Sequence, residues 1–132
     1  MGGPAVELKL LGCAILIGVV QLIWAAGAAR RQQNLQWASG PRDEPMPLTG
    51  VAGRLDRAFK NYMETFPLFA AAVIAVYLAA KLGPLTVWGC GLYVAARAIY
   101  PAIYAAGIPL LRTVVWGVSL AGFLMVVAAL FL

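Results

Sequence analysis

The sequence predicts an all-α integral membrane protein, a bundle of four transmembrane helices in a single domain. Of the 132 residues, 63% are hydrophobic and only 11% are charged, whereas roughly a quarter of the residues in a soluble domain are charged. The apolar residues fall into four long runs separated by polar or Gly/Pro-containing segments. We expect one domain over residues 1–132, with helices at about 5–30, 53–82, 85–106 and 110–131.

The first helix is predicted from an apolar run over residues 10–29 that only Gln21 interrupts. At about 1.5 Å per residue, this run can cross the roughly 30 Å hydrocarbon core of a bilayer. It is longer than the apolar region of a usual signal peptide, and Arg30 and Arg31 follow it directly. The amide of Gln21 is expected to join this helix to a neighbouring one.

The second and third helices are predicted to be antiparallel neighbours. The connection over residues 30–53 is rich in Gly, Pro and charged residues, so the second helix is expected to begin near Gly53. Only a tight turn at 81–84 separates it from the third helix. Pro67 is expected to kink the second helix, and Pro101 is expected to interrupt the third.

The distribution of basic residues predicts the orientation in the membrane. Residues 30–60 contain six Lys and Arg, whereas the turn at 81–84 contains one. The positive-inside rule therefore places the first loop in the cytoplasm and both termini outside. A Gly/Pro turn at 107–109 precedes the fourth helix on the cytoplasmic side, where the charged start of the second helix also lies.

The composition excludes several classes of site. The chain contains no His, so histidine metal ligands and general bases are excluded, and we expect no metal site. The basic residues cluster in one loop, a distribution that does not indicate a nucleic-acid partner. Cys13 and Cys90 lie in apolar runs and are expected to be buried thiols, and a disulfide between them stays open. Neither has a cationic neighbour in the sequence, so a catalytic thiolate is not expected.

The charged residues near the apolar runs indicate an anionic ligand. At 100° per residue, one face at the start of the second helix carries Arg54, Arg57, Asn61 and Glu64, with Lys60 on its flank. Arg57, Arg97 and Arg112 each cost about 3 kcal/mol at the centre of a bilayer, and Glu64 is expected to pair with only one of them. Guanidinium groups would bind the carboxylates of a ligand.

The arginines and tyrosines of the third and fourth helices have an alternative role that involves no ligand. Arg97 and Arg112 would instead extend to the membrane interface if they serve no ligand. The tyrosines that share a stripe with Arg97 either pack at the interface or direct their hydroxyls to the ligand: Tyr93, Tyr100 and Tyr104. Arg112 lies in the first turn of the fourth helix beside Thr113, where a ligand thiol would have its pKa lowered by charge and hydrogen bonding.

Three separated blocks of this sequence resemble the MAPEG family, the membrane-associated proteins of eicosanoid and glutathione metabolism. The segment 57–67 is similar to the family signature, met here by Arg57, Asn61, Glu64 and Pro67. The family also has an Arg followed by a Tyr seven residues later, as Arg97 and Tyr104 are, and an Arg beside Ser or Thr opening the last helix, as Arg112 and Thr113 are. Lys60 stands where several family enzymes have Arg. The short chain looks like the bacterial members.

The resemblance implies a homotrimer in a bacterial inner membrane, with glutathione bound as co-substrate between neighbouring protomers. Arg112 would be the catalytic residue that stabilises the glutathione thiolate. Eight residues would bind glutathione, the first from the adjacent subunit: Arg30, Arg57, Lys60, Asn61, Glu64, Arg97, Tyr104 and Thr113. A lipophilic substrate would enter from the membrane lipids.

Two functions therefore follow from the resemblance. The first is a membrane-bound glutathione transferase or peroxidase that adds the thiolate to a lipophilic electrophile or reduces a lipid hydroperoxide. The alternative is a non-catalytic lipid-binding protein or an accessory membrane subunit of the same fold. A small transporter is less favoured, because the sequence shows no inverted repeat.

Overall fold

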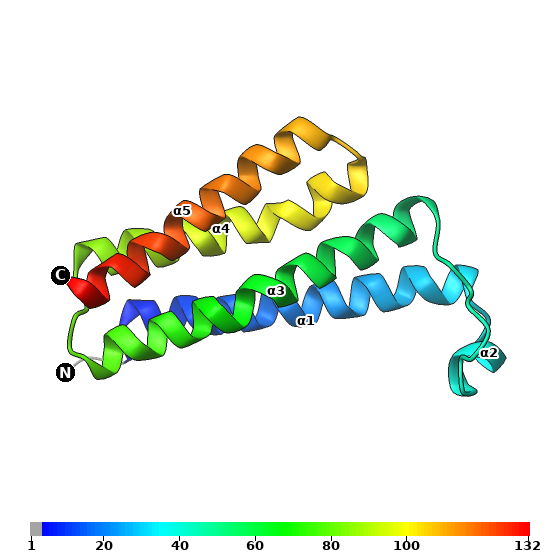
Figure 1. Cartoon of the computed structure of the whole chain (residues 1–132), viewed down its shortest axis with the longest axis horizontal. Coiled ribbons are helices and arrows are strands. Elements are labelled where there is room, and N and C mark those ends of the chain that lie inside the picture. The colour runs from blue at the N-terminus through cyan, green and yellow to red at the C-terminus, as the bar shows by residue number, and fades with distance from the viewer. Residues whose placement is uncertain (1–3) are drawn as a thin grey trace.

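The computed structural model describes residues 4–132, and all the regular structure in that range is helical. Four of the helices are long: α1 (Val6–Gln32), α3 (Gly50–Leu78), α4 (Pro84–Ala106) and α5 (Pro109–Phe131). Figure 1 shows α1 and α3 side by side, with α4 and α5 forming a second antiparallel pair against them. The start of α1 and the end of α5 lie at one end of the bundle, and the connection between α1 and α3 lies at the other, the loop end.

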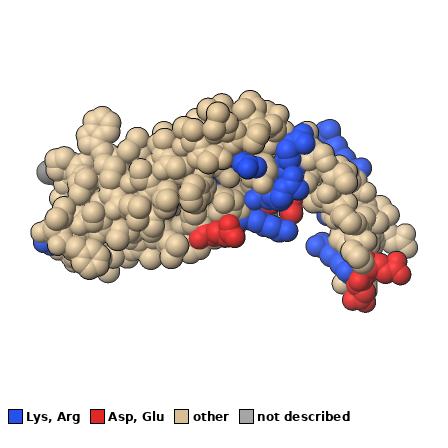
Figure 2. All heavy atoms as spheres, turned by 45° about the horizontal axis from the view of Figure 1, so that its top comes forward, with Lys and Arg blue, Asp and Glu red and all other residues tan. Residues whose placement is uncertain are grey.

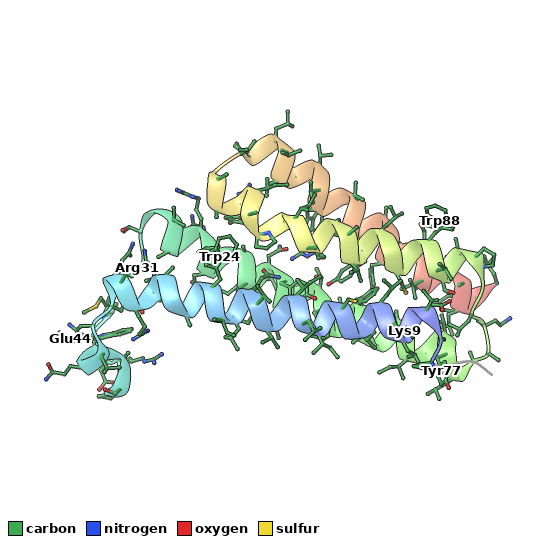
Figure 3. The ribbon with its side chains drawn as sticks, turned by 180° about the vertical axis from the view of Figure 1, so that it is seen from behind. Lys9, Trp24, Arg31, Glu44, Tyr77 and Trp88 are labelled. Carbon is green, nitrogen blue, oxygen red and sulfur yellow. The ribbon has the colours of Figure 1, made fainter. Side chains whose placement is uncertain are left out.

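Three helices are long and apolar enough to cross a membrane, namely α1, α3 and α5. The composition thus supports three of the four expected spans. α4 is not among them, since its 23 residues include Arg97, Thr86 and three tyrosines. Figure 3 shows Lys9, Tyr77 and Trp88 toward one end of the bundle and Trp24 and Arg31 toward the loop end. Aromatic and cationic side chains at both ends of an apolar body are typical of a protein that spans a bilayer.

The second helix differs from its expected position. It was expected over about 53–82, whereas α3 begins at Gly50 and ends at Leu78. Ala80 adopts a left-handed conformation with φ 57°, and the Lys81 N–H bonds the Val76 carbonyl at 2.9 Å. This pattern of a left-handed residue and a six-to-one hydrogen bond closes the end of a helix.

A short helix that the sequence analysis did not predict lies in the loop. α2 (Leu35–Ser39) has five residues, too few for a periodic pattern to reveal. The Asn34 carboxamide caps it by accepting a hydrogen bond from the Trp37 N–H at 2.6 Å. The Gln33 side chain donates to the Met46 carbonyl at 2.5 Å, which ties the returning loop to the end of α1.

α4 and α5 pack through a contact between two glycines. A Cβ added to Gly122 would lie 2.5 Å from the Gly89 carbonyl oxygen, and one added to Gly89 would lie 2.7 Å from the Gly122 oxygen. No side chain fits at either position. Glycines let the two helix backbones approach this closely, as is common between membrane helices.

Aromatic side chains join α3 to α1 and to α4. The rings of Phe69 and Tyr93 stack with their centroids 3.9 Å apart, and the Tyr93 and Thr65 hydroxyls are 2.9 Å apart. The Tyr62 hydroxyl donates a hydrogen bond to the Ala14 carbonyl of α1. These contacts fix which face of α3 is buried and leave its charged first half beside the loop end.

Two further expectations were wrong. Pro101 does not interrupt the third helix, because α4 continues to Ala106. At Pro67 a kink was expected, and the helix α3 continues past this residue. Neighbouring helices can compensate for the hydrogen bond that such a proline removes.

Cys13 is exposed rather than buried, whereas Cys90 is buried, and both thiols are free. Cys13 therefore lies on the face of α1 that points away from the single chain.

Candidate functional site

A cavity of about 410 Å³ lies between α3, α4 and α5 near the loop end. Most of its lining residues were singled out by the sequence analysis. The lining consists of Arg57, Lys60, Asn61, Glu64, Tyr100, Tyr104, Arg112, Thr113 and Trp116. In the view of Figure 2, Lys and Arg side chains gather toward this end, while the long body of the molecule is almost free of charge. The volume lies within the usual range for small-molecule sites.

The first half of α3 supplies four of these residues because of helical spacing. Arg57, Lys60, Asn61 and Glu64 stand at positions i, i+3, i+4 and i+7, so they share one face. Arg54 lies on the same stripe but does not line the cavity. Its Nε donates to the Ala105 carbonyl at 3.0 Å, so it stabilises the end of α4 instead.

The turn between α4 and α5 brings Arg112 to the same cavity. Gly107 ends α4 in a left-handed conformation with φ 74°, which residues with a Cβ adopt only with strain. The chain reverses within two residues, and Pro109 begins α5. Arg112 therefore returns over Tyr104, with its guanidinium carbon 4.8 Å from the centroid of the Tyr104 ring.

Two cations meet at the Tyr104 ring. The guanidinium carbon of Arg57 lies 5.9 Å from this ring, compared with 4.8 Å for Arg112. A cation over a tyrosine ring gains roughly 0.5–2 kcal/mol, depending on its exposure. The aromatic ring thus holds two like charges in one place without neutralising either.

The charges in the cavity are mostly unpaired. Among residues 4–132, the one ion pair joins Lys60 to Asp56 at 2.9 Å. The expectation that Glu64 pairs with an arginine was wrong. Lys60 pairs with the carboxylate on its N-terminal side, the direction in which helical side chains lean. Arg57, Arg112 and Glu64 therefore keep their charges available to a ligand.

Asn61 and Thr113 contribute polar atoms to the cavity wall. The Oδ1 atom of Asn61 is buried and accepts no hydrogen bond within the described part of the chain. A buried unpaired acceptor is costly, which makes it a candidate for a ligand donor. The Thr113 hydroxyl donates to the Pro109 carbonyl at 3.0 Å, so its oxygen is left as an acceptor.

Arg97 is close to the cavity but does not line it. Its side chain is fully buried, and none of its three guanidinium nitrogens has a hydrogen-bond partner in the described residues. The guanidinium carbon lies 4.2 Å from the Tyr100 ring and 5.2 Å from the Tyr62 ring. Tyr100 also lines the cavity, so this ring stands between the buried cation and the site.

Arg30 lines a different cavity. This second space, of about 480 Å³, lies between α1, the loop and α3, and Arg57 and Lys60 also border it. The Arg30 side chain donates to the Gln33 carboxamide oxygen at 3.4 Å. Within one chain, Arg30 and Arg112 thus border separate spaces on either side of Arg57.

Two lining residues are not among the predicted site residues. Tyr100 was named in the tyrosine stripe, which was expected either to pack at the interface or to face the ligand, and Trp116 was not singled out. Each lies four residues from a predicted site residue on the same helix, Tyr100 before Tyr104 and Trp116 after Arg112. The same helical spacing could have revealed both.

A family model described as the MAPEG family matches residues 10–132, essentially the whole chain. No curated protein matches the chain.

Proposed function

The chain belongs to the MAPEG family, and we propose on this basis that it is a membrane-bound glutathione-dependent transferase or peroxidase. The family includes glutathione transferases and peroxidases as well as non-catalytic members. The observation that carries the proposal is the pair of guanidinium groups, Arg57 and Arg112, that face one cavity together with the carboxylate of Glu64, all three without an ion-pair partner among residues 4–132.

Glutathione carries the charges that complement this cavity. Its two carboxylates would bind Arg57 and Lys60, while its ammonium group would bind Glu64 and the Asn61 carboxamide oxygen. Tyr104 and the Thr113 oxygen would complete the polar contacts. Arg97 would act through the Tyr100 ring, as a buried positive charge that favours an anion in the site.

Arg112 would stabilise the glutathione thiolate. Its guanidinium lies in the first turn of α5, where the positive end of the helix dipole also favours an anion. Both effects lower the pKa of a bound thiol without a protein base. The thiolate would then form a carbon–sulfur bond with an electrophile. With a hydroperoxide it would attack the distal oxygen and break the O–O bond, so that the alkoxide leaves and is protonated to the alcohol while the sulfur becomes a sulfenic acid. The thiol of a second glutathione would then attack this sulfur and release water, which gives the disulfide.

The assembly that we propose is a homotrimer of four-span protomers in a bacterial inner membrane. The first loop would face the cytoplasm, with both termini outside, because residues 30–60 hold six of the ten Lys and Arg. α4 would be the fourth span, with Arg97 shielded by aromatic rings. Arg30 would complete a neighbouring protomer's site, since in its own chain it borders the other cavity.

The test is a glutathione titration of the purified protein, with the thiolate followed by ultraviolet absorbance at neutral pH. A saturable thiolate signal is expected for the wild type and for Arg31→Gln, whose side chain does not line this cavity. Arg112→Gln is expected to bind glutathione and to lose the thiolate signal. Binding without a thiolate in the wild type would favour a non-catalytic family member.

A further inference from the structure

Arg42 is a cation of the loop between α1 and α3 to which the proposed site gives no role. It lines the cavity of about 480 Å³ that Arg30 also borders. Figure 1 shows α2 and the rest of this loop projecting from the bundle beside the end of α1, on the side away from α4 and α5. The Arg42 side chain is exposed in the single chain, so a neighbouring protomer can reach it.

The backbone at Arg42 is strained. Its φ is 59°, in the left-handed region that residues with a Cβ adopt only with strain. A glycine at this position would avoid the strain but would lose the side chain. Backbone strain of this kind is concentrated at functional sites, so it points to a role for the Arg42 guanidinium.

Two contacts fix the direction of this guanidinium. The Arg42 Nε donates to the Ala38 carbonyl at 2.8 Å, and the guanidinium carbon lies 5.5 Å from the centroid of the Trp37 ring. Trp37 is held in turn, because its indole Nε1 donates to the Glu44 carbonyl at 2.7 Å and its backbone N–H donates to the Asn34 carboxamide. The Arg42 side chain is therefore preorganised before a ligand binds.

The charge of Arg42 is available to an anion. The one ion pair among residues 4–132 joins Lys60 to Asp56, so no carboxylate in that range neutralises Arg42. Its Nε bonds the chain, while the other N–H groups of the planar fork match the two oxygens of a carboxylate. The chemistry of a suitable partner is thus that of a carboxylate.

We propose that Arg42 binds the glycine carboxylate of glutathione in the site of a neighbouring protomer, beside Arg30. This rests on the proposed function, in which glutathione is the ligand and Arg30 completes a neighbouring site. The two arginines border one cavity, so an interface that brings Arg30 to a neighbour's ligand brings Arg42 with it. Glycine is the end concerned, because the ammonium group and the carboxylate next to it belong to the γ-glutamyl end, which Glu64 would hold.

Isothermal titration calorimetry with glutathione and with glutathione amide, in which the glycine carboxylate is a carboxamide, tests this contact. Arg42→Gln is expected to weaken glutathione binding about tenfold, as the loss of a charge-assisted bond implies, and to leave binding of the amide unchanged. Arg31→Gln makes the same change of charge on a side chain that lines neither this cavity nor the first, and it is expected to bind both ligands as the wild type does.

The outcomes separate this inference from the proposed function. An equal effect of Arg42→Gln on the two ligands would overturn the role of Arg42 while glutathione binding by the wild type stands. Failure of the wild type to bind glutathione would overturn the proposed function and this inference with it.

Two further positions separate binding from folding. Arg42→Gly removes the guanidinium and relieves the backbone strain, so it is expected to melt no lower than the wild type and still to lose affinity for glutathione. Trp37→Leu removes the ring that orients Arg42 and is expected to weaken glutathione binding about two- to fivefold, whereas Trp37→Phe keeps an aromatic ring and the affinity. Wild-type affinity in Arg42→Gly would contradict the proposal.

Mixed assemblies test whether Arg42 acts across the interface. Arg42→Gln and Glu64→Gln chains are each expected to bind glutathione weakly on their own. Co-expressed and co-purified through different tags, they are expected to form assemblies in which some sites regain wild-type affinity, because the Glu64→Gln chain supplies Arg42 to the intact Glu64 of its neighbour. If Arg42 served its own chain, no site would hold both side chains. A mixed assembly that binds no more tightly than its parts would therefore overturn the proposal.

Discussion

The guanidinium carbon of Arg112 lies 4.8 Å from the centroid of the Tyr104 ring, so the first turn of α5 covers the last turns of α4. Seven residues lie between the two in sequence, and the left-handed Gly107 among them makes the close return possible. The ring fixes the position of the cation while leaving its charge free. The proposed thiolate chemistry therefore depends on Tyr104 as well as on Arg112.

Tyr104→Leu is expected to raise the pKa of the bound glutathione thiol by about half a unit to one unit. The reason is the loss of a cation–ring contact of about 1 kcal/mol that orients Arg112. Tyr104→Phe keeps the ring and is expected to keep the thiol pKa near its wild-type value. Ultraviolet absorbance as a function of pH measures both. Equal pKa values in the two variants would show that the ring does not orient Arg112.

Glu64→Gln is expected to weaken glutathione binding by about tenfold or more. The exposed Glu64 carboxylate has no cationic partner within residues 4–132, and a charge-assisted bond to the ligand ammonium is worth about 1.5–3 kcal/mol. Glu44→Gln removes an equal charge from the loop, outside the cavity, and is the control. Isothermal titration calorimetry gives both dissociation constants. An unchanged constant for Glu64→Gln places the ammonium group elsewhere.

Arg97→Met is expected to raise thermal stability and to weaken glutathione binding. The fully buried guanidinium has no hydrogen-bond partner among the described residues, so an apolar side chain of similar length removes a desolvation cost of about 1 kcal/mol or more. The same change removes a positive charge behind Tyr100. Thermal melting and a glutathione titration report the two effects separately. A lower Tm would show that the buried guanidinium is stabilised by a bound group.

Gly122→Ala is expected to lower the stability of the bundle by about 1–3 kcal/mol, the usual cost of overpacking. The new Cβ would lie 2.5 Å from the Gly89 carbonyl oxygen, so α5 would have to move away from α4. Gly117→Ala on the same helix meets open space and is expected to be neutral or slightly stabilising. Thermal melting in detergent compares the two. Equal Tm values would contradict the close helix contact.

The sequence by itself determined the four long helices and the residues that share each of their faces. Long apolar runs are sufficient to place membrane helices, because a bilayer requires a minimum length of apolar chain. The spacing of Arg57, Asn61 and Glu64 placed them on one face, since the helical period relates residues of the same helix. The family resemblance, which rested on these residues, is confirmed by the match over residues 10–132.

Only the tertiary structure decided what each face meets. Arg54 bonds a carbonyl of α4, although it shares a stripe with Arg57, and Lys60 pairs with Asp56 rather than Glu64. Arg97 is enclosed by aromatic rings, whereas Tyr100, three residues later, reaches the cavity. Helical periodicity fixes the directions in which side chains point around the axis of their own helix. The rotation of that axis and the identity of its neighbours depend on contacts between helices, such as that of Gly89 with Gly122, which join residues far apart in the sequence.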